Sequence, residues 1–186
     1  MKLVVGITGS TGVIYGIRLL EILKRLNIET HLIMSEWAQK CISMETDHDL
    51  NYVKSLATEN SNEENMAANI SSGTHKTDGM IVIPCSMKTL SSVANGYDET
   101  LVARVAGVSL KESRKLILVV RETPLTAINL ENMLKLARLG VIILPPVKEF
   151  YIKPKGIADL VNHIVGKCLD QFNIEHELFT RWGSNN

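Results

Sequence analysis

The sequence predicts an α/β protein built on a parallel sheet. Five short stretches rich in Val, Ile and Leu are typical of buried strands. Segments with apolar residues at helical spacing separate them, as in Ile14, Ile17 and Leu20. This alternation of strands and helices favours a parallel sheet with right-handed crossovers. The predicted strands span residues 3–7, 30–34, 80–83, 116–120 and 141–144.

The remaining segments are assigned as helix, tail and surface loop. Residues 157–172 are predicted to form the last helix, and the aromatic residues of the tail over 179–182 are expected to be exposed. The polar run 58–65 is expected to be a solvated surface loop. With 186 residues, 45% apolar content and no internal repeat, the chain suits a single domain over residues 1–186.

Composition argues against several classes of function. Lys and Arg total 20 and Asp and Glu total 20, so no overall field favours nucleic acid. The three cysteines are far apart in the sequence, which predicts neither disulfides nor a zinc site and fits a reducing cytoplasm. The first apolar run is too short for a signal peptide, and no run approaches the roughly 20 residues of a membrane span. We therefore expect a cytoplasmic protein without a membrane or metal site.

The residues after the predicted strands are small and polar. In open α/β sheets, ligands bind beyond the carboxyl ends of the strands. Residues 6–12 read G-I-T-G-S-T-G before a helix, which suits a mononucleotide phosphate but equally a ligand-free turn. Ser86 follows another strand, where it can cap a helix, bind a ligand or do both. Arg121 and Glu122 end a buried strand, so they are expected to pair with each other or with a bound group.

Seven blocks of sequence resemble the UbiX-like flavin prenyltransferases. The resemblance runs in order through nearly the whole chain, and the blocks together are far more specific than any one of them. They are G-I-T-G-S-T-G-V-I-Y-G (6–16), I-S-S-G (70–73), P-C-S-M-K-T-L (84–90), L-K-E-S-R-K-L (110–116), R-E-T-P-L (121–125), N-L-E-N-M-L (129–134) and F-Y (150–151) with a downstream Lys167.

The resemblance implies both a fold and an activity. The fold is a flavodoxin-like, Rossmann-type doubly wound parallel sheet in three αβα layers. The enzyme would bind reduced FMN noncovalently and join to its N5 and C6 a dimethylallyl group from dimethylallyl phosphate. The resulting prenylated FMN would serve a separate UbiD-like decarboxylase. The family's closed oligomers, often dodecamers, imply a homo-oligomer with its sites at subunit interfaces.

The resemblance also assigns residues. FMN-binding positions correspond to Gly9, Ser10, Thr11, Ser35, Ser86, Met87, Lys88, Thr89 and Arg121. Substrate positions correspond to Tyr151, Lys167, Arg104 and Met66, the last standing where some members carry Trp. Catalytic positions correspond to Glu122, Lys111 and Thr11, and the cations of the Arg104 and Lys111 positions reach in from a neighbouring subunit.

These residue types suit the chemistry of an allylic phosphate. Lys111, Arg121, Tyr151 and Lys167 can stabilise charge on the departing phosphate without a metal. Glu122 is the candidate proton acceptor, with the released phosphate as the other possibility. Cys85 is expected to be a small packed residue, and the five histidines are expected to be structural or solvated.

Two other functions remain open at this point. An FMN-dependent decarboxylase or oxidoreductase would reduce its flavin with the substrate and need no isoprenoid. A noncatalytic FMN-carrying subunit of a decarboxylase would copurify with a larger partner and tolerate replacement of Glu122. An NAD site ranks last, because the chain lacks G-x-G-x-x-G.

Overall fold

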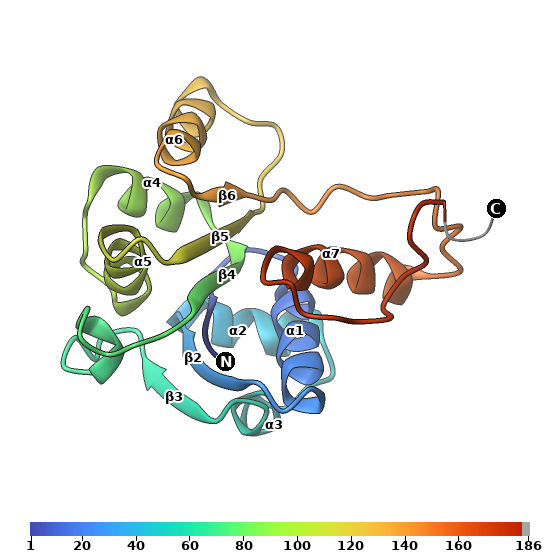
Figure 1. Cartoon of the computed structure of the whole chain (residues 1–186), viewed down its shortest axis with the longest axis horizontal. Helices are drawn as coiled ribbons and strands as arrows, with labels where there is room; N and C mark the ends of the chain where they lie inside the picture. The colour runs from blue at the N-terminus through green and yellow to red at the C-terminus, as the bar shows by residue number, and fades with distance from the viewer. Residues whose placement is uncertain (184–186) are drawn as a thin grey trace.

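A computed structural model describes residues 1–183, which are built around a six-stranded sheet whose pairings are all parallel (Figure 1). The strands lie in the order β3-β2-β1-β4-β5-β6, which is the Rossmann order. Without the edge strand β3, the other five follow the flavodoxin-like order. The predicted fold class is confirmed. The strands are β1 (Lys2–Ile7), β2 (Glu29–Met34), β3 (Glu59–Asn62), β4 (Gly79–Cys85), β5 (Lys115–Val120) and β6 (Ile142–Ile143).

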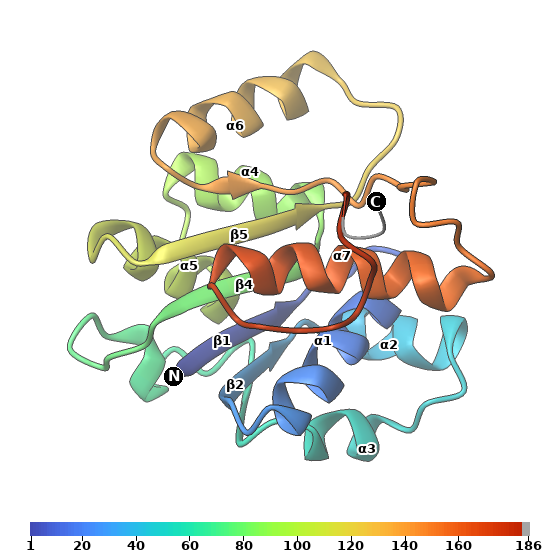
Figure 2. The ribbon, with the colours of Figure 1, turned by 45° about the vertical axis from the view of Figure 1, so that its right-hand side comes forward.

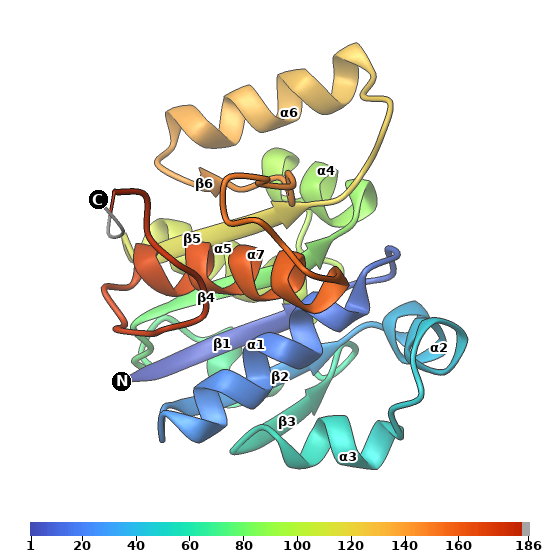
Figure 3. The same ribbon diagram turned by 90° about the vertical axis from the view of Figure 1, so that its right-hand side faces the viewer.

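Helices cover both faces of the sheet and produce the predicted three layers (Figure 2, Figure 3). Alternate side chains of β1 point to opposite faces, so Leu3 and Val5 pack under α1 and α7, whereas Val4 packs with α4, α5 and α6. No helix within residues 1–183 is both long and apolar enough to cross a membrane. The helices are α1 (Val13–Arg25), α2 (Glu36–Glu45), α3 (Leu50–Ser55), the 3₁₀ helix η1 (Asn69–Ser71), α4 (Met87–Asn95), α5 (Leu101–Lys111), α6 (Ala127–Arg138) and α7 (Ile157–Gln171).

The edge strand β3 corrects the expectation of a surface loop over residues 58–65. Its sequence E-N-S-N has no apolar residue, yet it pairs in parallel with β2. Polar neighbours satisfy its side chains: Lys2 Nζ lies 3.0 Å from Glu59 Oε1, and His31 Nε2 lies 2.8 Å from Ser61 Oγ. Because these partners come from β1 and β2, a polar segment can form a strand here without burying apolar surface.

The last strand and the tail also differ from expectation. The predicted strand over 141–144 is reduced to Ile142–Ile143, which are half-buried because β6 is a sheet edge. Trp182 is exposed as predicted, but Phe179 is half-buried, and its ring centroid lies 4.6 Å from that of His163. The expectation of an exposed aromatic tail is therefore wrong for Phe179.

The order in which the strands are added to the sheet reverses between β1 and β4. Strands β2 and β3 lie on one side of β1, and β5 and β6 lie on the other side of β4. Helix α1 approaches this point closely, since a Cβ added to Gly16 would lie 2.5 Å from the Ile83 carbonyl oxygen. In doubly wound folds, such a switch point opens a crevice at the carboxyl ends of the strands. The candidate site lies there.

Candidate functional site

A cleft of about 340 Å³ lies at the carboxyl edge of the sheet. Its walls come from the segments that follow the first five strands, so residues far apart in the sequence meet in it. Nine of the predicted site residues line it: Gly9, Ser10, Ser35, Ser86, Met87, Lys88, Thr89, Arg121 and Glu122. The other lining residues are Thr8, Trp37, Glu63, Ser92, Thr100 and Val102.

Hydroxyl groups tie the strand ends together beneath the cleft. The buried Thr8 hydroxyl donates to the Pro84 carbonyl at 2.9 Å and accepts from the Ser86 N–H at 2.8 Å. The Ser10 hydroxyl donates to the Arg121 carbonyl at 3.1 Å. These bonds join the ends of β1, β4 and β5 at the cleft.

The start of α4 supplies the clearest anion-binding feature. Ser86 caps this helix: its hydroxyl accepts from the Thr89 N–H at 3.3 Å and lies 3.1 Å from the Thr89 hydroxyl. Ser86, Met87, Lys88 and Thr89 all line the cleft, so the positive end of the helix dipole opens into it. Ser86 therefore caps the helix, one of the roles predicted from the sequence, and also lines the cleft. Its binding of a ligand stays a prediction.

The glycine-rich loop before α1 contributes less to the cleft than its sequence indicates. Gly12 has a φ of 98°, which favours glycine, and its N–H donates to Glu45 Oε2 at 2.7 Å. A carboxylate of the protein thus takes one of the donors expected to hold a phosphate. Thr11 is exposed and does not line the cleft, whereas Gly9 and Ser10 do.

Arg121 and Glu122 follow β5 and both face the cleft. Arg121 is half-buried, but Glu122 is exposed and accepts from the Thr123 N–H at 3.0 Å. Among the ion pairs of residues 1–183, none pairs either residue with an opposite charge. Glu122 is therefore not buried, contrary to expectation. Of the two predicted arrangements, an ion pair between Arg121 and Glu122 does not form.

Two lining residues were not expected from the sequence. Trp37 is 62% exposed at the start of α2, and a Cβ on Gly9 would lie 2.5 Å from its Cβ, so glycine is needed for this approach. Glu63 follows β3; its Oε1 accepts from the Glu36 N–H at 2.7 Å, and its carbonyl accepts from the Leu101 N–H at 2.7 Å. The rule about strand ends would have found Glu63 if β3 had been recognised as a strand.

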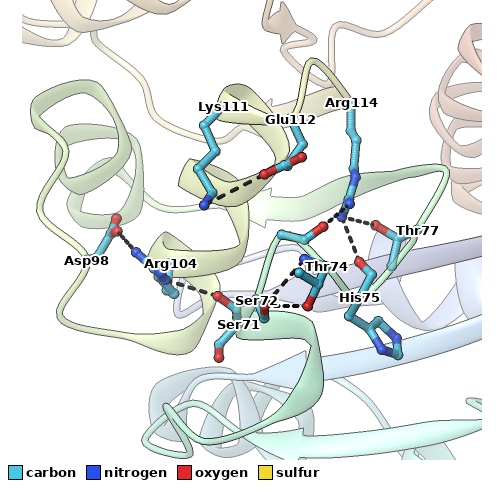
Figure 4. A network of polar contacts seen from close by, with 11 residues as sticks. Ser71, Ser72, Thr74, His75, Thr77, Asp98, Arg104, Lys111, Glu112 and Arg114 are labelled. Atoms are coloured by element: carbon cyan, nitrogen blue, oxygen red, sulfur yellow. Dashed lines mark hydrogen bonds and ion pairs between the residues drawn. The ribbon is translucent and has the colours of Figure 1, made fainter.

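Arg104 and Lys111 do not line the cleft of their own chain. Figure 4 shows the polar contacts that each of them makes instead. Arg104 donates to the Ser71 carbonyl at 3.1 Å and pairs with Asp98 at 3.1 Å. Lys111 is the last residue of α5, which puts it roughly 13 Å along the helix from the cleft residue Val102. It lies 3.7 Å from Glu112. One chain therefore does not bring these two cations to the cleft.

The other three substrate candidates are also separate from the cleft. Tyr151 lines another hollow beside Arg181 and Trp182, and its hydroxyl lies 3.4 Å from His163 Nε2. Lys167 is exposed on α7. Met66 is 40% exposed in the segment between β3 and η1.

The buried thiols and histidines have structural environments. Burial raises the pKa of the Cys85 thiol and raises that of Cys168 to about 12, so neither is a thiolate at neutral pH. Burial also lowers the pKa of His31 and His163, which favours neutral imidazoles. The interpretation of Cys85 as a packed residue agrees with its complete burial.

Comparison with known proteins identifies the family of this chain. Residues 1–169 match the family model described as Flavoprotein. A protein of Saccharomyces cerevisiae, described as "Flavin prenyltransferase PAD1, mitochondrial", is 52% identical over 181 residues, which are 97% of this chain and 75% of the yeast protein. The chain belongs to the UbiX-like flavin prenyltransferase family.

Two solved structures have nearly the same fold as this chain. The structure described as AnUbiX (PadA1) in complex with FMN and dimethylallyl pyrophosphate has a TM-score of 0.97 and 49% identity, covering 100% of this chain and 98% of its own. A dodecameric FMN-dependent UbiX-like decarboxylase from Escherichia coli O157:H7 has a TM-score of 0.97 and 51% identity, covering 99% of this chain and 100% of its own. The predicted family and enzyme class are confirmed.

Proposed function

We propose that this flavin prenyltransferase moves a dimethylallyl group from dimethylallyl phosphate to N5 and C6 of reduced FMN. The observation that supports this most directly is the cleft at the strand ends, lined by hydroxyl groups, a helix N-terminus and the cation of Arg121, which has no carboxylate partner among the described residues. Such a surface suits a ligand that carries both an aromatic ring system and a phosphate.

The residues of the cleft fit FMN by their chemistry. The N-terminus of α4, with the hydroxyls of Ser86 and Thr89 and the ammonium of Lys88, would hold an anionic phosphate. The indole of Trp37 and the side chain of Met87 offer apolar contact area for a flat ring. When bound, reduced FMN supplies the two nucleophilic atoms, N5 and C6.

The protein's part in the transfer is to stabilise charge and accept a proton. The allylic C–O bond breaks with its electron pair on the phosphate oxygen, where Arg121 and neighbouring cations stabilise the negative charge. The first bond would form at N5 with loss of the N5 proton. The second bond would need a proton added to the remaining double bond, so that C6 can bond to the tertiary carbon, and loss of the proton on C6. Glu122 or the departing phosphate would donate the first of these protons and accept the second. Glu122 is exposed in the single chain, so bound flavin or a second subunit would have to desolvate it.

Neighbouring subunits complete the site in this proposal. Arg104, Lys111, Tyr151 and Lys167 lie outside the cleft that contains Arg121, so their proposed roles require other copies. The dodecameric relative from E. coli supports such an assembly. Thr11 and Met66 keep their assigned roles only if the cleft reshapes when ligands bind.

The wider setting follows from the reaction. We take residues 1–186 as one flavoprotein domain in the cytoplasm, although the yeast relative is described as mitochondrial. The product would pass to a UbiD-like decarboxylase. Neither nucleic acid, a membrane nor a metal is expected to take part.

The test is anaerobic incubation of the purified protein with reduced FMN and dimethylallyl phosphate, followed by mass spectrometry of the released flavin. A mass gain of one C5 unit supports the proposal. Unmodified flavin from protein that binds FMN, with the mono- and diphosphate donors both tried, refutes it. Substrate-driven flavin reduction would then favour a decarboxylase or oxidoreductase, and copurification with a larger enzyme would favour a carrier subunit.

A further inference from the structure

The side chain of Tyr151 has ring partners on two sides and remains partly exposed. Its hydroxyl lies 3.4 Å from Nε2 of His163, and the two rings meet edge to face with centroids 6.0 Å apart. The ring of Trp182 also meets Tyr151 edge to face, with centroids 5.3 Å apart. Tyr151 is nevertheless 40% exposed. The two contacts therefore hold the ring while leaving part of it accessible to a ligand.

His163 is a buried histidine that carries one proton on its ring. Its only hydrogen-bond partner among residues 1–183 is the Tyr151 hydroxyl, and its Nδ1 is buried without a partner there. Burial lowers the pKa of His163, although the carboxylates of Glu149 and Asp170 oppose this shift. The imidazole is therefore neutral at neutral pH.

The position of this proton decides what the Tyr151 hydroxyl can do. On Nδ1 the proton would form a buried N–H without an acceptor. On Nε2 it is donated to the Tyr151 oxygen, and Nδ1 keeps only a bare lone pair. Buried donors without partners are rarer in proteins than buried acceptors without partners, which favours the proton on Nε2. The hydrogen of the tyrosine hydroxyl is then available for a ligand.

We propose that His163 is a positioning residue whose Nε2–H donates to the Tyr151 oxygen and turns the tyrosine O–H toward the phosphate of the allylic substrate. The inference rests on the proposed function, in which Tyr151 contacts this phosphate. His163 is buried, so it acts through Tyr151. Without His163 the hydroxyl can rotate away, and fewer molecules present it to the phosphate in the productive orientation.

The place of His163 on α7 agrees with this role. Lys167, the other proposed phosphate contact on this side of the molecule, stands four residues further along the same helix. Side chains with this spacing lie on one face of a helix. One face of α7 therefore carries both the proposed phosphate-binding ammonium and the imidazole that orients the Tyr151 hydroxyl.

The tail after α7 fixes the imidazole in turn. It runs back along this helix (Figure 1, Figure 2), and the Phe179 ring packs on His163 with centroids 4.6 Å apart. Gly166 permits this approach, since a Cβ there would lie 2.5 Å from the Phe179 ring. Two hydrogen bonds from Arg181 to Asp170, at 2.7 and 3.2 Å, tie the tail to the helix. The direction of the His163 Nε2–H is thus set by packing.

The test is calorimetric titration of dimethylallyl phosphate into the full chain loaded with oxidised FMN, so that the donor binds without transfer. His163→Leu removes the N–H at similar volume and should raise the Kd for dimethylallyl phosphate by about five- to tenfold, the effect of one hydrogen bond. The Kd for FMN should not change, because His163 does not line the cleft. His163→Gln retains an N–H donor and should restore most of the affinity.

A double-variant cycle with Tyr151→Phe separates positioning from packing. Without the tyrosine hydroxyl, His163→Leu should have no further effect on the Kd for dimethylallyl phosphate, whereas a packing role would cost the same in both backgrounds. Val165→Ala is the matched control, because Val165 is buried in the core on the same helix, so the change should lower Tm and leave this Kd unchanged. His163→Phe, which keeps a ring against Phe179, is a second variant without the donor.

The outcomes separate this inference from the proposed function. Wild-type affinity in His163→Leu, an equal loss with and without the Tyr151 hydroxyl, or no recovery in His163→Gln each overturns the positioning role. Wild-type affinity in Tyr151→Phe overturns it together with the proposed contact of Tyr151. Unmodified flavin from a wild-type protein that binds the donor refutes the transfer alone, because the binding measurements do not depend on it.

Discussion

Ser86 has two roles in the proposed site, and two substitutions separate them. Ser86→Ala removes the cap of α4 at a cost of about 1 kcal/mol, which lowers Tm by roughly 2–4 °C in a protein of this size. It also removes a hydrogen bond to the flavin phosphate worth about 1.5–3 kcal/mol, so the Kd for FMN should rise by about ten- to a hundredfold. Ser86→Asp keeps a good cap but puts a negative charge toward the phosphate, so Tm should be retained while FMN affinity falls further.

Fluorescence titration of FMN and thermal unfolding without FMN measure the two effects. Asp49→Ala is the matched control, because Asp49 caps α3 with bonds to the N–H groups of Asn51 at 2.8 Å and Tyr52 at 3.3 Å and does not line the cleft. It should lower Tm similarly and leave the Kd unchanged. If Ser86→Asp binds FMN as tightly as the wild type, the phosphate does not lie at the start of α4.

Three further predictions concern catalysis, pH and metals. Glu122→Gln should retain FMN binding and slow prenyl transfer by about a hundredfold or more, in single-turnover assays, if the carboxylate accepts the proton. Burial lowers the pKa of His31 and His163, so the unfolded chain binds their protons more readily, and the free energy of unfolding should fall in denaturant titrations as pH drops below about 6.5. Transfer should proceed at the same rate in the presence of EDTA.

Each of these has a contrary result. Full activity of Glu122→Gln would leave the released phosphate as the proton acceptor. An unfolding free energy that stays constant on acidification to about pH 5.5 would mean that the two histidines are equally accessible to protons in both states. Loss of transfer in EDTA, restored by a divalent cation, would contradict charge stabilisation by side chains alone.

The sequence predicted the central part of the fold because burial leaves a simple pattern there. Strands β1, β2, β4 and β5 are covered on both faces, so each contains a run of consecutive apolar residues. Strand β3 escaped prediction because its stability comes from polar partners on β1 and β2, which are distant in the sequence. Strand β6 was predicted too long because a sheet edge needs fewer paired residues.

Residues of the cleft could be predicted where a polar or charged side chain directly follows a strand. Ser86 and Arg121 occupy such positions, and both line the cleft. Trp37 could not be assigned, because its place depends on the absence of a side chain at Gly9. Lys111 was assigned only from the family resemblance. No pattern in the sequence places it at the cleft, and in a single chain it lies far from it.

The double contact of Glu63 couples two walls of the cleft mechanically. One residue accepts from the first N–H of α2 through its side chain and from the first N–H of α5 through its backbone. Neither helix start can loosen fully without disturbing the residue that also holds the other. The two walls should therefore open as one cooperative unit, with the amide hydrogens of Glu36 and Leu101 exchanging with solvent at similar free energies. The residue that follows a polar edge strand thereby links two walls of the cleft.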